Sequence, residues 1–295
     1  MEKYFEKAFE GVACQFEILN SMISDQASAS DYCARIKRKY DRFFKEKDAR
    51  TINQFGIRYY RAKKLVYSSA QMWMESRIAK GNECTVSYYF LMYYALFQAM
   101  QANLIIDPSI GNEKAEKLGH GEVPKIFKAC YCDVKSCPMD DKIIAAFWKL
   151  RDCREYFSYA MPFQLTESVV IHDEEVNFYL KACYQLMNLQ LFIISEKCRR
   201  SIDIDRSELD QVRTYFIKQC NRLGGFETFT DPADEDFWID LKNCLGIDLM
   251  PLSIAFEHDF DEYGTYDETV YKKIGIPNTG KIVSGALRYL WSAIC

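Results

Sequence analysis

Apolar residues recur at intervals of three and four along most of the chain, which is the pattern of amphipathic helices. The first such run predicts an N-terminal helix and consists of Phe5, Phe9, Val12, Phe16 and Leu19. Asp31 is expected to cap a second, strongly basic helix. Further helices are expected at about 51–79 ending at Gly81, at 139–160, after Asp173, from Ser207 to about Gly224, and at 279–294.

The segment 84–106 carries no charged residue and is long enough to span a bilayer. It nevertheless contains many polar groups, which lipid would leave without hydrogen-bond partners. They are Ser87, Tyr88, Tyr89, Tyr93, Tyr94, Gln98, Gln101 and Asn103. A buried core helix ended by Asp107-Pro108 is therefore the prediction, with a membrane span as the alternative.

The chain has no clean period-two alternation, so an all-α fold is predicted. The segment 226–278 is less regular and leaves room for a short hairpin. Three regions are expected: an N-terminal helical region at 1–80, a helical bundle at 81–201 and a C-terminal, mostly helical extension at 202–295. The pattern leaves open whether the outer regions are separate domains or wrap the central bundle.

Composition narrows the class of protein. With 295 residues, 49% of them hydrophobic and 15% aromatic, the chain has ample material for a core and does not resemble a disordered protein. Its net charge of −4 argues against nucleic-acid binding that relies on the overall charge of the protein. The twelve cysteines are dispersed among apolar helical positions, and the N-terminus has no apolar signal-peptide core. We therefore expect a cytoplasmic protein with free thiols and no membrane association.

The stretch 150–159 contains the most informative polar residues. On a helix, Arg151, Arg154 and Ser158 share one face at spacings of three and four. Two arginines beside an apolar face can hold a phosphate. The alternative is that they pair with neighbouring acids such as Asp152 and Glu155.

Three features occur in the order found in the HEPN superfamily of small helical bundles, which the chain resembles over about residues 80–200. They are the tyrosine-rich segment 87–100, the histidine-containing segment 119–127 and the run Arg154–Tyr159. The last resembles the family signature, in which histidine follows arginine by four to six residues. Here Tyr159 stands where the ribonucleases of the family have histidine.

The resemblance implies a metal-independent endoribonuclease without a cofactor, acting on RNA as a toxin or anti-phage defence effector, with a homodimer expected and a regulatory protein as a further partner. Arg154 would stabilise the transition state, Arg151 and Ser158 would hold the substrate, and Tyr159 and His120 would supply or position protons. The alternative function is a non-catalytic HEPN-like module for dimerisation or partner binding, which the loss of the signature histidine favours.

A third hypothesis is a zinc site formed by Cys130, Cys132 and Cys137 with His120. The cysteine spacing is not that of paired structural zinc ligands, so no metal is expected. His172 and His258 are expected to be structural. The basic residues of the second helix form either a solvated face or an arm that guides RNA; they are Arg35, Lys37, Arg38, Lys39 and Arg42.

Overall fold

The computed structural model describes residues 3–9, 14–134, 136–160, 171–195, 209–220, 232–242, 249–253 and 279–295. Within these ranges the regular structure is entirely helical and no strand occurs, which confirms the all-α prediction. The larger helices are α2 Gln26–Glu46, α3 Ala49–Gly81, α4 Thr85–Ile106, α7 Lys142–Glu155, α8 Asp173–Ser195, α9 Leu209–Cys220, α10 Pro232–Lys242 and α12 Thr279–Ile294. The short elements are η1 Glu6–Ala8, α1 Glu17–Ser21, α5 Asn112–Glu116, α6 Val123–Phe127, and the π-helical turns η2 Lys128–Cys132 and η3 Tyr156–Ala160.

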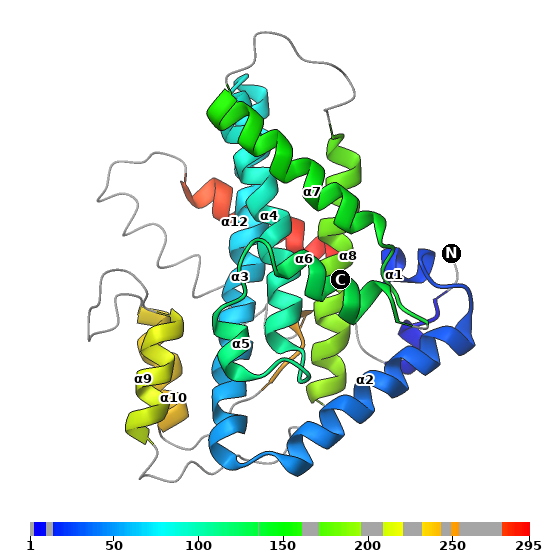
Figure 1. Cartoon of the computed structure of the whole chain (residues 1–295), viewed down its shortest axis with the longest axis vertical. Helices are drawn as coiled ribbons and strands as arrows, with labels where there is room; N and C mark the ends of the chain where they lie inside the picture. The colour runs from blue at the N-terminus through cyan, green and yellow to red at the C-terminus, as the bar shows by residue number, and fades with distance from the viewer. Residues whose placement is uncertain are drawn as a thin grey trace.

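Helices α3, α4 and α8 run side by side through the centre of the molecule (Figure 1). The most extensive packing is between α3 and α4, which are joined by a short turn. Helix α12 packs against α3 and α8, while α1 and α2 pack against α8. Helix α7 packs along α4, and the pair α9 and α10 lies against α3 through α9.

Helix α4 is the centre of the core, as its lack of charged residues predicts. Most of its side chains are buried, including those of Tyr93 and Asn103. No helix in the described ranges combines the length and the apolarity that a bilayer crossing requires. The prediction of a buried core helix is therefore confirmed for 84–106.

The C-terminal end of α4 is capped by a buried arginine from α3. Arg58 is 1% exposed and donates through Nε to the carbonyl of Ile105, at 2.7 Å. Its Nη2 donates to the carbonyl of Asp107 at 3.0 Å, and its Nη1 donates to the carbonyl of Ile110 at 2.7 Å and to Oδ1 of Asn112 at 2.9 Å. The last carbonyls of a helix lack intrahelical donors and carry partial negative charge. A guanidinium at this position therefore supplies hydrogen bonds and also offsets the negative charge.

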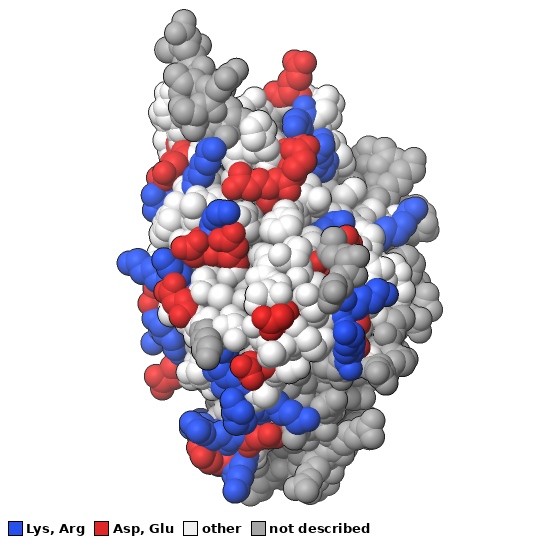
Figure 2. Space-filling model, turned by 90° about the vertical axis from the view of Figure 1, so that its right-hand side faces the viewer, with Lys and Arg blue, Asp and Glu red and all other residues white. Residues whose placement is uncertain are grey.

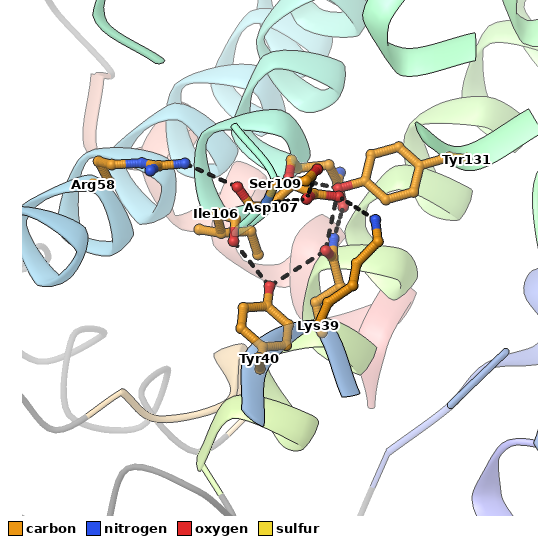
Figure 3. Close-up of polar contacts among 9 residues, drawn as sticks. Lys39, Tyr40, Arg58, Ile106, Asp107, Ser109 and Tyr131 are labelled. Atoms are coloured by element: carbon orange, nitrogen blue, oxygen red, sulfur yellow. Dashed lines mark hydrogen bonds and ion pairs between the residues drawn. The ribbon is translucent and has the colours of Figure 1, made fainter. Parts of the chain in front are cut away.

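Two buried tyrosines complete the cap. The Tyr40 hydroxyl from α2 donates to the carbonyl of Ile106 at 2.9 Å, and the Tyr131 hydroxyl from η2 donates to the carbonyl of Asn103, also at 2.9 Å (Figure 3). Side chains from α2, α3 and η2 thus converge on one helix end.

The carboxylate of Asp107 provides the negative charge in this cluster. It is fully buried and accepts hydrogen bonds from the backbone N–H and the hydroxyl of Ser109. Nζ of Lys39 lies 3.3 Å from Oδ2 of Asp107. The buried carboxylate is therefore paired with a lysine, and the buried guanidinium is hydrogen-bonded to neutral oxygens, which together make the buried charges tolerable.

Helices α1 and α12 meet on α8 through Gln185. Its Oε1 accepts from the backbone N–H groups of Ile18 and Leu19, at 3.0 and 3.2 Å. Its Nε2 donates to the carbonyl of Ala293 at 2.8 Å. One buried side chain therefore joins segments from near both ends of the chain.

The predicted N-terminal amphipathic helix is wrong. The described part of this segment contains only η1 and α1, and polar side chains fold the chain back on itself. Oδ1 of Asn20 accepts from the backbone N–H of Phe5, and a carboxylate oxygen of Glu6 accepts from that of Phe16. These bonds replace the intrahelical bonds that a continuous helix would make.

The second helix begins earlier than predicted because Asp25, and not Asp31, caps it. Oδ1 of Asp25 accepts from the backbone N–H of Ser28 at 2.7 Å. In 226–278 the described residues contain α10 and no strand, and the rest of that segment lies outside the described residues. The division at 80 and 201 stays a prediction.

Candidate functional site

The residues that the HEPN resemblance selects lie on three neighbouring segments. Helix α4 supplies the tyrosine-rich stretch, the connection between α5 and α6 supplies His120, and α7 supplies the two arginines. Helix α4 packs against both α6 and α7, so the segments meet at its surface.

His120 is exposed and rests on aromatic side chains of α4. Its ring stacks on Phe97 with centroids 4.2 Å apart and an interplanar angle of 30°, and it meets the edge of Tyr94 at 5.5 Å. Nδ1 of His120 lies 2.9 Å from the hydroxyl oxygen of Tyr93. A solvent-accessible imidazole is thus held in one orientation, which is unlike the free side chain of an ordinary loop.

Arg154 reaches the same tyrosine from α7. Its guanidinium carbon lies 4.7 Å from the centroid of the Tyr93 ring, a cation–π geometry. Its Nη2 donates to a carboxylate oxygen of Glu155 at 3.1 Å, and its buried Nε has no hydrogen-bond partner among the described residues. The side chain is 17% exposed, while Glu155 is 49% exposed, so the arginine is neither sealed inside nor fully satisfied.

The electrostatics of this cluster favour a neutral imidazole. Burial, followed by the charge of Arg154, lowers the pKa of His120. Burial raises the pKa of Tyr93 to about 12, although Arg154 opposes the effect. At neutral pH the site therefore contains one fixed positive charge, a protonated phenol and a ring with a reduced tendency to take up a proton.

Arg151 lies one turn earlier on α7 and is held differently. Its guanidinium stacks over Trp148 at 4.4 Å, and its Nη2 donates to Oδ1 of Asp152 at 2.8 Å. The hydrogen bond with Asp152 raises the pKa of Arg151. Both arginines therefore pair with neighbouring acids, Arg151 with Asp152 and Arg154 with Glu155, as the alternative expects, and Arg154 in addition has one buried donor without a partner among the described residues.

Tyr159 and Ser158 lie beyond the regular part of α7. From Tyr156 the backbone is π-helical, which changes the angular spacing of successive side chains. Tyr159 is 81% exposed and makes no hydrogen bond to another described residue, while Ser158 is half-buried. The structure thus joins His120 to Arg154 through Tyr93 and gives Tyr159 no such contact.

The cysteine cluster does not include His120. Sγ of Cys137 donates to the backbone carbonyl of Cys132 at 2.9 Å, and burial raises the pKa of Cys130 to about 11. Across the described residues, no group of three or more His, Cys, Asp or Glu side chains is arranged to hold a metal ion. The zinc hypothesis gains no support from this arrangement.

The remaining basic and histidine candidates have other surroundings. On α2, Arg35 lies over the ring of Tyr32 and Lys39 pairs with Asp107, whereas Arg38 is exposed. Basic and acidic side chains are interspersed over the face in Figure 2, with a basic group at its lower end. The carbonyl of His172 accepts backbone bonds from the first turn of α8, and His258 lies outside the described residues.

Comparison with known proteins finds no similar protein. No family model matches the chain, and neither a curated protein nor a solved structure matches it. The class that the fold defines is therefore an all-helical protein, and its function has to be argued from the site.

Tyr93 and Phe97 are the members of the site that sequence reasoning missed. They stand four residues apart on one helical face, so together they predict an aromatic surface but not what rests on it. The HEPN resemblance covers the tyrosine-rich segment as a whole and assigns no role to either side chain.

Proposed function

We propose that the protein is a HEPN-like endoribonuclease whose substrate phosphate binds at Arg154 and His120. The observation that carries the proposal is the meeting of these two side chains on Tyr93, from segments that follow the order of the HEPN pattern. The all-helical fold is consistent with that family, although no family model matches the chain.

In the proposed reaction the ribose 2′-hydroxyl attacks the adjacent phosphorus. An O2′–P bond forms while the P–O5′ bond breaks, the 2′-hydroxyl loses its proton, and the departing 5′ oxygen gains one. The products are a 2′,3′-cyclic phosphate and a 5′-hydroxyl, and no metal is required. Arg154 would stabilise the negative charge that develops on the phosphorane oxygens.

The remaining residues would act around this centre. Arg151 and Ser158 would hold a neighbouring part of the RNA, and Tyr159, which solvent reaches freely, would donate a hydrogen bond or proton. As the resemblance implies, two protomers would meet at their signature helices. A toxin or defence role, with a protein that restrains the activity, remains part of this proposal.

The decisive experiment is an RNA-cleavage assay on the full chain and its Arg154→Ala variant, using single-stranded, structured and transfer RNA. We expect Arg154→Ala to lower cleavage by at least about 100-fold, the scale of losing a charge-stabilising donor. Arg288→Ala, which changes an exposed arginine on α12, is the matched control and should cleave normally. A chain that cleaves none of these RNAs, or an active Arg154→Ala variant, contradicts the proposal.

A non-catalytic HEPN-like module is the second candidate function. Two observations favour it: Tyr159, at the signature position, makes no contact with the His120 cluster, and most of Arg154 is covered. RNA binding without cleavage, measured by fluorescence anisotropy, would select this function. Light scattering would establish whether the module forms a dimer.

A further inference from the structure

The hydroxyl of Tyr93 has a single hydrogen-bond partner among the described residues, Nδ1 of His120 at 2.9 Å. Tyr93 is fully buried, so water does not offer its hydroxyl an alternative acceptor. The contact can be made in two ways. Either the phenol donates to a bare Nδ1, or a protonated Nδ1 donates to the phenol oxygen.

Only the first arrangement gives the hydroxyl hydrogen of Tyr93 an acceptor. If Nδ1 carried the proton, the hydroxyl hydrogen of Tyr93 would be buried without an acceptor, which costs the full desolvation of that group. The phenol also stays protonated at neutral pH, since burial raises its pKa to about 12. The Tyr93 hydroxyl therefore donates, and a neutral His120 ring carries its hydrogen on Nε2.

The neighbouring cation presents donors as well. Nε2 of His120 has no hydrogen-bond partner among the described residues. The Nε of Arg154 is buried, so it is the 17% of this side chain that stays exposed that makes its charge accessible to a ligand. Glu155 is the acid in contact with Arg154, and it occupies one terminal nitrogen of the guanidinium. Hydrogen-bond donors from a cation and from a fixed imidazole suit a ligand whose atoms only accept hydrogen bonds. A phosphate oxygen is such an acceptor.

We infer that Tyr93 is a positioning residue that fixes His120 as an Nε2–H donor, so that His120 and Arg154 form a binding site for the phosphodiester of RNA. The inference rests on the proposed function and assigns His120 a narrower role in it. His120 binds a phosphate oxygen and does not remove the 2′-hydroxyl proton, because its free nitrogen has no lone pair.

The proton balance of the cleavage step follows from this assignment. The 2′-hydroxyl proton passes to a hydroxide ion from solvent, which becomes water. Water then returns a proton to the departing 5′ oxygen, and hydroxide is regenerated. The protein contributes orientation and charge stabilisation to this step.

Nitrogen-15 NMR of the histidine-labelled full chain tests the tautomer directly, with His120 assigned through His120→Gln. At about pH 8, above the reference pKa of histidine, we expect the proton on Nε2, and inorganic phosphate should shift that resonance. Tyr93→Phe keeps the ring beneath Arg154 and removes only the hydroxyl, so phosphate binding should weaken by about threefold to tenfold. A wild-type ring protonated on Nδ1, or an Nε2–H that phosphate leaves unmoved, would overturn the inference.

Two substitutions of His120 then distinguish a role as hydrogen-bond donor from a role as proton acceptor. Glutamine offers an amide N–H near the place of Nε2, whereas alanine offers none. We expect His120→Gln to bind phosphate within about threefold of the wild type and His120→Ala to lose about tenfold; equal losses would contradict a donor role. Phosphate binding with the expected tautomer, but without cleavage of any RNA, would reject the nuclease and leave the phosphate site standing.

Discussion

Arg58 and Arg154 show how differently one fold can use the same side chain. Arg58 is 1% exposed, and its Nε, Nη1 and Nη2 donate to three backbone carbonyls and one amide oxygen at the end of α4. Arg154 lies over the ring of Tyr93, donates to Glu155, and keeps Nε without a partner among the described residues. All three nitrogens of the Arg58 guanidinium are bonded within the fold, whereas 17% of the Arg154 side chain remains exposed and can meet a ligand.

The difference teaches that burial alone does not distinguish a structural arginine from a functional one. Both side chains are largely covered, yet the hydrogen-bond partners differ. Burial lowers the pKa of Arg58 to about 10, which leaves it charged at neutral pH and dependent on its acceptors. A partly exposed guanidinium that shares Tyr93 with an exposed imidazole is the feature that suggests binding at Arg154.

The largest expected effect is on folding. Arg58→Met removes the guanidinium donors to the carbonyls of Ile105, Asp107 and Ile110, of which only that of Asp107 keeps a backbone donor, the N–H of Ile110. The free energy of unfolding should therefore fall by about 3 to 5 kcal/mol. Urea unfolding followed by circular dichroism measures the change, with Arg288→Met as the exposed control. A loss below about 1 kcal/mol would mean that water replaces the guanidinium, and the contrast with Arg154 would disappear.

A smaller effect on stability is expected at Arg154. Arg154→Ala removes one cation–π contact and one ion pair with a half-exposed acid, together worth about 0.5 to 1 kcal/mol. It also removes the buried Nε that has no partner, which offsets part of that loss. Urea unfolding under the same conditions checks this value, and destabilisation as large as that of Arg58→Met would identify Arg154 as structural.

The smallest effect is a pH dependence that comes from His120. Its pKa is lowered in the folded protein, so the unfolded chain binds the proton more readily. The associated stability is therefore complete above the unfolded pKa of about 6.5 and decreases as the pH falls through the folded value. The imidazole ring is exposed, so we expect the free energy of unfolding to change with pH by only a small fraction of its total value.

The measurement is the difference in Tm between the wild type and His120→Gln at a series of pH values. This difference cancels the contributions of His172 and His258. In an Arg154→Ala background the pH dependence of this Tm difference should weaken, because the charge of Arg154 is one cause of the lowered pKa of His120. The Tm of the wild type minus that of His120→Gln should fall as the pH is lowered through the folded pKa of His120, and a rise of this difference on lowering the pH would contradict the sign.

Long helices with strong local signals were predictable from the sequence. Helices α3, α4 and α12 start and end within a few residues of expectation, and α8 starts where it was expected. Each has a clear apolar pattern, and signals such as Asp107 mark some of the ends. The five-residue helices α5 and α6 were not expected, since so short an element is stabilised mainly by tertiary packing. The break before α1 likewise depends on the side-chain bonds of Asn20 and Glu6.

The candidate site was predictable only in part. The HEPN resemblance selected His120 and Arg154, and the structure brings both to α4. It also selected Tyr159, which stands in the sequence where the signature has histidine, but the chain becomes π-helical at Tyr156 and Tyr159 is 81% exposed. Arg58 looked like any other basic residue of its helix, because its acceptors come from residues about fifty positions away.

The side chain of Gln185 has a consequence for the order in which the chain folds. It bonds α1 through Ile18 and Leu19, and α12 through Ala293, while the backbone N–H of Gln15 bonds the carbonyl of Ile294 at 2.9 Å. Closing so long a segment in one step is entropically unfavourable, whereas the α3–α4 hairpin needs only a local turn. Local pairing of α3 with α4 is therefore expected to precede the docking of α8, and the joining of the two distant segments on α8 to come last.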